Sequence, residues 1–447
     1  MIGLYYIWIL LLLLLLLIIG RGKKGGVLCL SYFLGLSLIH VPGLYVNSSI
    51  SNSLINNIET EKGFIVTLYG MISFIVGSLL VKIIYQKNAV SIVKKYDYQK
   101  QSRYLFILGS MVYFFLMPVI YFIPSLTSLI SPLTGLLTVA FFMHFYHSKI
   151  YNSKLHLLLG LVFLPILPLL TMFTSGFAGF GSYWVITIIS FLYIIFKKRY
   201  FIIFGPIVGA FAISFSVSYF KERDALREKV WYQNSSFSDR LEVFEDMITN
   251  FELIDKDNSD HAKLIDERLN QNILIGQAID LREKGITEQA MGSTIPLWVF
   301  IPRIVWPDKP NVGGSNTLVA DYTGRTFVSG TSVGVGQSLE FYINFNTLGV
   351  IIGFFLYGII LMILDINIIH FLNEGNFIGI IKSSLVGIAM LQPGGSLMEV
   401  IIAVIGSFIL SPIIARQISL KTFIGNFTSK DKKIKNQIIN NWQITKN

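Results

Sequence analysis

The chain has 447 residues, of which 53% are hydrophobic and only 14% charged, and its mean hydropathy is +0.63. Soluble domains carry about 25% charged residues, so this composition excludes an ordinary water-soluble protein and predicts an all-α polytopic membrane protein. The formal net charge of +10 does not indicate a nucleic-acid partner, because residues 221–340 hold 13 Lys/Arg against 19 Asp/Glu and the remainder holds 23 against 7.

The first predicted element is an apolar run at residues 3–19, and its neighbouring basic residues follow it rather than precede it. That order is typical of a retained first span with the N-terminus outside, and not of a cleaved signal peptide. A membrane span needs ~20 mostly apolar residues. Taken in chain order, about eleven spans are predicted, at residues 3–19, 26–46, 64–85, 104–123, 127–146, 156–174, 182–196, 200–220, 342–365, 377–393 and 397–415.

Basic residues gather in alternate connections, at 21–24, 87–103, 149–154 and 197–199, and again after residue 416. The positive-inside rule places such segments on the cytoplasmic side. Four regions are therefore predicted: 1–220 with about eight spans, an extracytoplasmic loop at 221–340, three spans at 341–415, and a basic cytoplasmic tail at 416–447.

The long loop is predicted to be partly helical. Apolar residues recur at helical spacing from Phe237 to Ile248, and Ser236 with Asp239 forms a capping-box pattern before them. A second helix is expected from about Asp260 to Lys284. The segment IPLWVFIPRIVWP at 295–307 is apolar, aromatic and interrupted by three prolines, which favours a position at the membrane interface.

Cationic residues of this loop are the predicted binding groups for a phosphorylated ligand. A guanidinium grips phosphate with two parallel hydrogen bonds and stays charged. Prolines within residues 302–310 lock several φ angles, so they would hold the nearby cations in a fixed pose, with a tryptophan as interfacial anchor. The predicted substrate-binding residues are Arg223, Arg227, Arg268, Arg303, Lys309, Arg325 and Trp306.

Ordinary structural roles remain open for some of these arginines. Ion pairs with Asp224 and Glu228 would also account for Arg223 and Arg227, which lie four apart on one helix face. For Arg268, and for Arg240 on the first loop helix, a solvated helix face is the competing interpretation.

Two carboxylates near the outer ends of spans are the predicted catalytic groups. Glu340 precedes the ninth span, and Glu399 opens the last span after the sequence QPGGS. Either can act as a general base toward a sugar hydroxyl. Asp365 is expected to reach cytoplasmic water at the inner end of the ninth span, and carries no predicted role.

No metal site and no cofactor are predicted. Cys29 is the only cysteine, which excludes a disulfide framework and a thiol metal site. His144 and His147 are one helical turn apart but have no third ligand close in sequence, so an interfacial pair is the preferred interpretation. The glycines of SVGVGQ lack the strand–turn–helix context of a phosphate loop.

The pattern of PR-x-x-WP-x-KP in a long, late outer loop of a many-span chain resembles the Wzy-type oligosaccharide repeat-unit polymerases, which make O-antigen or capsule. The segment EFYINFNTLGV at 340–350 is similar to that family's return into the membrane. Arg303 with Gly314, and Arg325 with Gly336, match an arginine-x10-glycine spacing that the family divides between two loops and that falls in one loop here. The residues that carry the proline–tryptophan match are Pro302, Arg303, Trp306, Pro307, Lys309 and Pro310.

This resemblance implies a metal-independent glycosyltransferase in the bacterial cytoplasmic (inner) membrane. It would join undecaprenyl-diphosphate-linked repeat units on the outer face, with arginines stabilising the diphosphate leaving group and a carboxylate deprotonating the acceptor. The implied partners are the lipid-linked oligosaccharide, the bilayer, and a chain-length regulator and flippase of the same pathway. Three alternatives stay open: a polysaccharide ligase, a flippase or transporter of lipid-linked oligosaccharide, and a structural or regulatory component of an envelope assembly.

Overall fold

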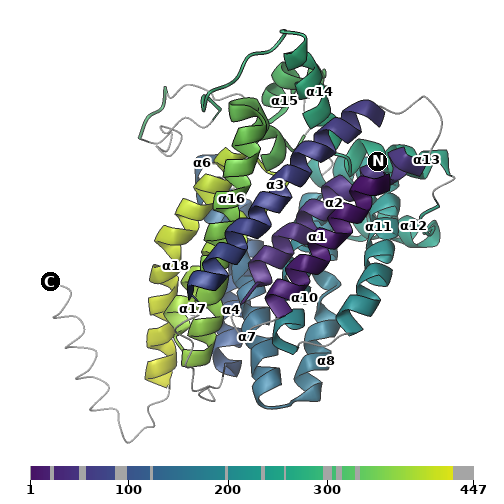
Figure 1. Ribbon diagram of the computed structural model, residues 1–447. Helices are drawn as coiled ribbons and strands as arrows, with labels where there is room; N and C mark the ends of the chain where they lie inside the picture. The colour runs from purple at the N-terminus through teal and green to yellow at the C-terminus, as the bar shows by residue number, and fades with distance from the viewer. Residues whose placement is uncertain are drawn as a thin grey trace, which may run out of the picture.

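The computed structural model describes residues 2–20, 25–49, 57–85, 98–120, 124–196, 200–232, 237–255, 258–294, 305–308, 315–327 and 333–425. Helices and turns account for all of the regular structure in these ranges, and no strand occurs in them. Figure 1 shows a bundle of long helices with shorter helices gathered at one end. The all-α class predicted from composition is therefore confirmed.

The first half of the bundle contains α1 (Ile2–Gly20), α2 (Val27–Ser49), α3 (Asn57–Ile84), α4 (Gln99–Met111), the π-helical η2 (Val112–Leu116), α5 (Met117–Ile120), α6 (Pro124–Ile130), the 3₁₀ helix η3 (Ser131–Gly135), α7 (Leu136–Ile150), α8 (Lys154–Phe163), α9 (Ile166–Ser175), α10 (Ala178–Phe196) and α11 (Tyr200–Arg227). The remainder contains η4 (Glu228–Tyr232), α12 (Phe237–Thr249), α13 (Ser259–Arg268), α14 (Asn272–Glu283), α15 (Ser315–Thr323), α16 (Gln337–Glu374), α17 (Phe377–Met390) and α18 (Leu397–Gly425).

Within the described ranges, seven helical segments are long and apolar enough to cross a membrane. They begin at Val27, Ile58, Gln99, Lys154, Ala178, Gln337 and Leu397. Two further helices, Gly3–Ile19 and Phe377–Met390, are apolar but shorter. The chain is thus a membrane-type helical protein, while the count of eleven spans and the side that each loop faces stay predictions.

Two expected continuous helices are interrupted in the structure. The expected span at 127–146 is divided into α6, η3 and α7, with Pro132 in the first turn of η3, where its missing N–H does no harm. The expected loop helix from Asp260 to Lys284 is divided into α13 and α14, and its end at Gly285 is confirmed by a left-handed φ of 69° there.

The core of the bundle is the contact between α3 and α16, which lie side by side in Figure 1. Glycines allow the two backbones to approach closely, as in many membrane helix pairs. A Cβ added at Gly358 would lie 2.2 Å from the carbonyl oxygen of Phe74, and one at Gly77 would lie 2.3 Å from that of Phe355. The 38-residue α16 is therefore held rigidly along much of its length.

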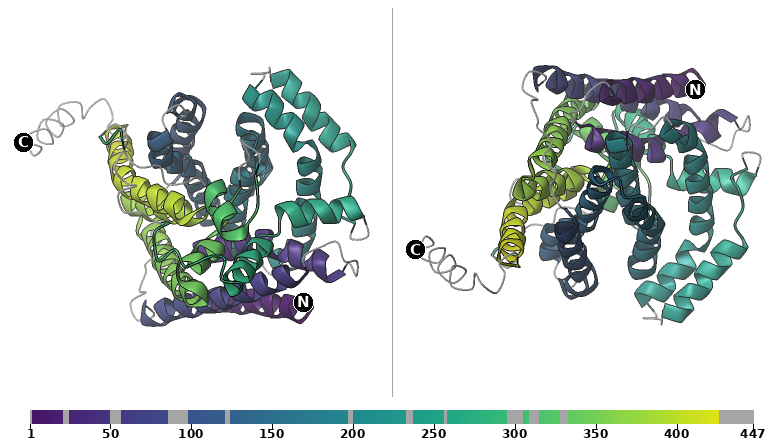
Figure 2. Two further views of the ribbon diagram at one scale, coloured as in Figure 1. Left: turned by 90° about the horizontal axis from the view of Figure 1, so that it is seen from above. Right: turned by 90° about the horizontal axis from the view of Figure 1, so that it is seen from below.

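The end of the bundle at which α14 and α15 lie, uppermost in Figure 1, is called the loop end below. The views along the bundle in Figure 2 show α11, α12 and α13 standing to one side of the central helices. Near the loop end α16 is kinked, because Phe345 and Asn346 have non-helical dihedral angles. The kink therefore sets the first turns of α16 off from the rest of the helix.

The linker between α13 and α14 is inserted into the backbone of α2. Pro42 lies inside α2 and has no N–H to donate, so it interrupts the helical hydrogen-bond ladder. The N–H of Gly43 donates instead to the carbonyl oxygen of Leu269 at 3.3 Å, and the N–H of Gln271 donates to that of Ile39 at 2.9 Å. Backbone groups from two distant parts of the chain thus satisfy each other.

Helix α14 is also fixed against α3. A Cβ at Gly276 would lie 1.9 Å from the carbonyl oxygen of Glu59, so the two helices are in backbone contact there. Beside this contact, the ammonium of Lys62 binds Asp280 at 2.6 Å and Glu283 at 2.8 Å. The described helices of the predicted loop are therefore a built part of the bundle rather than a loose connection.

Candidate functional site

Glu340 lies in the first turn of α16, where the kink separates it from the long span below. Its side chain is only 1% exposed. Oε2 accepts a hydrogen bond from the backbone N–H of Leu397 at 2.6 Å, and Oε1 accepts one from Thr294 Oγ1 at a longer 3.3 Å. The carboxylate is thus held firmly through one oxygen and weakly through the other.

Thr294 is positioned by a second side chain of the same helix. Asn344 Nδ2 donates to Thr294 Oγ1 at 2.8 Å and to the carbonyl oxygen of Glu340 at 2.7 Å, while its Oδ1 accepts from the N–H of Gly292 at 2.8 Å. The turn at 290–294 is therefore attached to α16. The proline-rich segment predicted to bind phosphate begins directly after this turn.

Glu399 meets Glu340 at the N-terminus of α18. The Glu399 carboxylate accepts from the N–H of Ser396 at 3.1 Å, and Ser396 Oγ accepts from the N–H of Glu399 at 3.2 Å. This reciprocal pair is a capping box, and Glu399 itself is exposed. Since a helix N-terminus stabilises negative charge, it provides the reason why two carboxylates can share this end of α18.

The glycine-rich approach to α16 pairs with the turn before α18. The N–H of Gly336 donates to the carbonyl oxygen of Gly394 at 3.1 Å, and the N–H of Gln337 donates to that of Pro393 at 3.2 Å. A Cβ at Gly334 would lie 2.6 Å from the same Gly394 oxygen, so this close pairing requires glycine. The side chain of Gln337 continues it by donating to Gln392 O at 2.6 Å and by accepting from the Tyr32 hydroxyl.

Arg223 and Arg268 form a pair of like charges between α11 and α13. Arg223 is 8% exposed, and its Nε has no hydrogen-bond partner among the described residues. Burial lowers the pKa of the Arg223 guanidinium below its usual range, and the charge of Arg268 lowers it further. Arg268 is exposed, as a solvated helix face requires. Two neighbouring cations, one of which has an Nε without a partner among the described residues, are suited to an anion.

Arg227 and Arg240 are instead engaged with the end of α9. Arg227 Nε donates to the carbonyl oxygen of Gly176 at 3.3 Å, and its guanidinium lies 4.2 Å from the ring centroid of Phe177. Arg240 Nη1 donates to Phe173 O at 2.8 Å. Cations that bind the last carbonyls of a helix are a common C-terminal cap. The solvated-face interpretation of Arg240 is therefore wrong, because this side chain is partly buried against α9.

Of the remaining predicted binding residues, the structure describes Arg325 and Trp306. Arg325 Nε donates to Gln277 Oε1 on α14 at 2.7 Å, and burial lowers its pKa while the charges of Asp266 and Glu267 raise it. Trp306 is 39% exposed. Arg303 and Lys309 lie outside the described residues, so the structure brings together Glu340 with Glu399 and Arg223 with Arg268, and leaves the proline-rich turn as a prediction.

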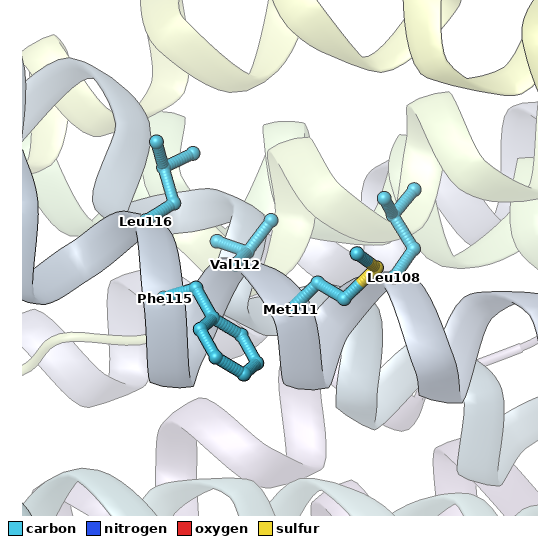
Figure 3. Close-up of a pocket in the computed structure, with 5 residues that line it drawn as sticks. All are labelled: Leu108, Met111, Val112, Phe115 and Leu116. Atoms are coloured by element: carbon cyan, nitrogen blue, oxygen red, sulfur yellow. The ribbon is translucent and has the colours of Figure 1, made fainter.

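Two other features of the structure resemble ligand sites, a histidine cluster and an apolar hollow. His156 joins His144 and His147, with ring centroids 5.6 and 5.5 Å away, but within the described residues no group of three His, Cys, Asp or Glu side chains can hold a metal ion. An apolar hollow of about 330 Å³ lies on α4 and η2 and has no charged group in its lining; Figure 3 draws the side chains that line it. It is lined by Leu108, Met111, Val112, Phe115 and Leu116.

Comparison with known proteins places the chain in one family. Residues 44–426 match the family described as "Domain of unknown function (DUF8712)". The chain belongs to this family. The match covers most of the bundle, including both carboxylates, both arginines of the α11–α13 pair and the linker inserted into α2. No curated protein matches, and no solved structure matches.

Several residues of this site were missed in the sequence. Thr294 and Asn344 carry no pattern that separates them from other polar loop residues. The capping box at Ser396 and Glu399 does have a recognisable spacing, Ser-x-x-Glu before an apolar run. That spacing predicts a helix start, and it would have indicated a structural role for Glu399 beside the catalytic one.

Proposed function

We propose that this protein polymerises undecaprenyl-diphosphate-linked oligosaccharide repeat units by glycosyl transfer on the outer face of the bacterial cytoplasmic membrane. The single observation that carries the proposal is the enclosed carboxylate of Glu340 at the loop end, directly beside the turn from which the proline–tryptophan–arginine segment departs. The resemblance of that segment to the Wzy-type polymerases supplies the reaction class.

In this proposal Glu340 is the general base. Its Oε2 is anchored by the N–H of Leu397, whereas among the described residues Oε1 has the single 3.3 Å contact with Thr294. Oε1 is therefore the oxygen that can take the proton of an acceptor hydroxyl. The carboxylate of Glu399 is already bonded in the capping box. In this proposal it adds negative charge to the site and does not accept the proton of the acceptor hydroxyl.

The cations bind the diphosphate of the donor. Arg223 offers a buried Nε without a partner among the described residues, and Arg268 adds a second positive charge close by. Arg303, Lys309 and Arg325 belong to the same loop. Guanidinium groups aimed at a developing phosphate charge stabilise the transition state without a divalent ion.

These groups account for the proton transferred and for the bonds formed and broken in the reaction. The acceptor hydroxyl loses its proton to Glu340 and its oxygen forms a bond to the anomeric carbon of the growing chain. The bond from that carbon to the diphosphate oxygen breaks, and the electron pair leaves with undecaprenyl diphosphate. A chain-length regulator and a flippase of the same pathway are the expected partners.

The test is a gel ladder of surface polysaccharide from a null strain complemented with variants at matched membrane levels. Glu340→Gln is expected to leave single-unit product, and Arg223→Ala and Arg303→Ala to shorten or abolish long chains. Glu374→Gln is the matched control, because Glu374 is an exposed carboxylate at the opposite end of the same helix. It should give the wild-type ladder.

Three results would redirect the assignment. Full-length but lipid-bound polymer in the null strain indicates the ligase. Loss of all outer-face repeat units indicates a flippase or transporter. A wild-type ladder from both Glu340→Gln and Arg303→Ala refutes the proposed chemistry and leaves a structural role in the envelope.

A further inference from the structure

A chain of polar side chains runs from α13 into α2, away from the carboxylate site. Its members are Asp266, Asn270, Asn272 and His40, and the last is 1% exposed. Asn270 Nδ2 donates to Asp266 Oδ1 at 2.6 Å, and Asn272 Nδ2 donates to Asn270 Oδ1 at 3.0 Å. Asn272 Oδ1 lies 2.7 Å from His40 Nδ1.

Further contacts fix which way each amide points. Asn272 Nδ2 also donates to the carbonyl oxygen of His40 at 2.7 Å, and a reversed amide would place two oxygens against each other there. Asn270 Nδ2 also lies 3.0 Å from Thr60 Oγ1, on the side away from Asn272. With Asn272 oriented in this way, its Oδ1 faces His40, and an amide oxygen only accepts hydrogen bonds.

The tautomer of His40 follows from this orientation. Nδ1 must carry the proton that is donated to Asn272, so in the neutral ring Nε2 carries the lone pair. Every hydrogen bond in the chain then runs in one direction and ends on the negative charge of Asp266. Hydrogen bonds aligned in this way polarise one another, which strengthens Nε2 as an acceptor.

No donor within the described residues reaches His40 Nε2, although the atom is buried. Buried polar atoms in folded proteins have a partner in the large majority of cases, from the protein or from ordered water. Here the imidazole is held in one tautomer and one orientation, and its accepting nitrogen has no partner among the described residues. Such a nitrogen can accept a hydrogen bond from an O–H group.

We propose that His40 Nε2 is the acceptor site for a single O–H donor, and that Asp266, Asn270 and Asn272 exist to hold the ring in the tautomer that accepts. The donor is either a buried water or a hydroxyl of a sugar-bearing lipid, two sources of one chemistry. This site does not include Glu340 or the arginines, although the charge of Asp266 also acts on Arg325.

The test is ¹⁵N NMR of the full-length protein with ¹⁵N-labelled histidine in lipid nanodiscs. The chain has six histidines, and His40 is assigned as the spin system lost in His40→Gln. If that variant fails to fold, His40→Asn, which keeps an amide near the Nδ1 position, supplies the assignment. The expected result is a protonated Nδ1 and an unprotonated Nε2 whose shift is that of a hydrogen-bonded acceptor.

Two nanodisc compositions distinguish the source of the hydroxyl. If the bonded signature is present in phosphatidylcholine alone and unchanged on adding galactosyl diacylglycerol, water is the donor. If the signature appears only with the galactolipid, the donor is a sugar hydroxyl. An Nε2-protonated tautomer, or an unbonded Nε2 in both compositions, overturns the proposal.

A matched pair of variants tests the chain itself. Asp266→Asn removes the charge that terminates the chain, so it should weaken the polarisation of the ring and move the Nε2 signal toward that of a weaker acceptor, with Nδ1 still protonated. Asp260→Asn removes an exposed carboxylate from the same helix and should leave the His40 signals unchanged. Equal spectra from the two variants would show that the charge of Asp266 does not act on His40.

Discussion

Gly276 is the position at which one added methyl group should separate the α14 helix from the bundle. A Cβ there would lie 1.9 Å from the carbonyl oxygen of Glu59, against about 3.4 Å for ordinary van der Waals contact. The backbone of α14 would have to retreat by about 1.5 Å, because a Cβ has no rotamer that avoids the contact.

The magnitude follows from two opposing effects. Overpacking in a well-packed contact costs typically 1–3 kcal/mol, and the rigid backbone on both sides favours the upper end. Replacing a helical glycine by alanine returns about 0.5–1 kcal/mol. Gly276→Ala should therefore destabilise the protein by about 2 kcal/mol, and the retreat should also weaken the ion pairs of Lys62 with α14 and the hydrogen bonds of Asn272 with His40 of α2.

The assay is thermal unfolding of the purified protein in detergent, with limited proteolysis to locate the loosened region. Gly179→Ala is the matched control, because it is also a helical glycine and nothing lies within 4 Å of its added Cβ. That control should be neutral or slightly stabilising. Equal unfolding temperatures for the two variants would refute the inferred backbone contact.

Three further outcomes are expected. Lys62→Met removes both ion pairs to α14 and should lower the unfolding free energy by less than about 1 kcal/mol, and by less still at high salt, since these pairs are partly exposed. A large loss of stability in thermal unfolding at both low and high salt concentration would contradict this. Tyr219→Phe removes the 2.6 Å hydrogen bond to Gly176 O and should lower the unfolding free energy by about 1 kcal/mol, and an unchanged denaturation midpoint would show that the bond contributes nothing. The hydrogen bond and charge of Lys221 lower the pKa of Glu252. The stability that this carboxylate contributes is therefore present above its ordinary pKa and is lost as the pH falls through the lowered value. When unfolding of Glu252→Gln is measured as a function of pH, this loss of stability in acid should be missing.

The class of the protein could be predicted from the sequence because apolar runs report directly on the solvent around each helix. The interruptions could not be predicted in the same way. Pro132 marks a break, but whether a proline ends, kinks or opens a helix depends on what replaces its missing hydrogen bond. The division between α13 and α14 has no strong local signal, because it depends on the backbone of α2 more than 200 residues earlier.

The candidate site shows the same division between local and distant information. Glu340 and Glu399 were identified singly, by their positions at the ends of apolar runs. Their meeting at one helix N-terminus depends on the pairing of Gly336 with Gly394, which no spacing in the sequence reveals. His40 was passed over because an isolated histidine in an apolar helix gives no indication of the asparagines that orient it.

The backbone exchange between α2 and the α13–α14 linker has a consequence for biogenesis. Ile39 and its neighbours are synthesised long before Gln271, so α2 enters the bilayer without the linker. The Gly43 N–H and the Ile39 carbonyl, a regular helical pair, must then bond to each other until the linker replaces that bond. An unsatisfied backbone group in hydrocarbon is costly, by several kcal/mol. The N-terminal half is therefore expected to wait in the membrane for the second half, and the two halves mature as one unit rather than as separable domains.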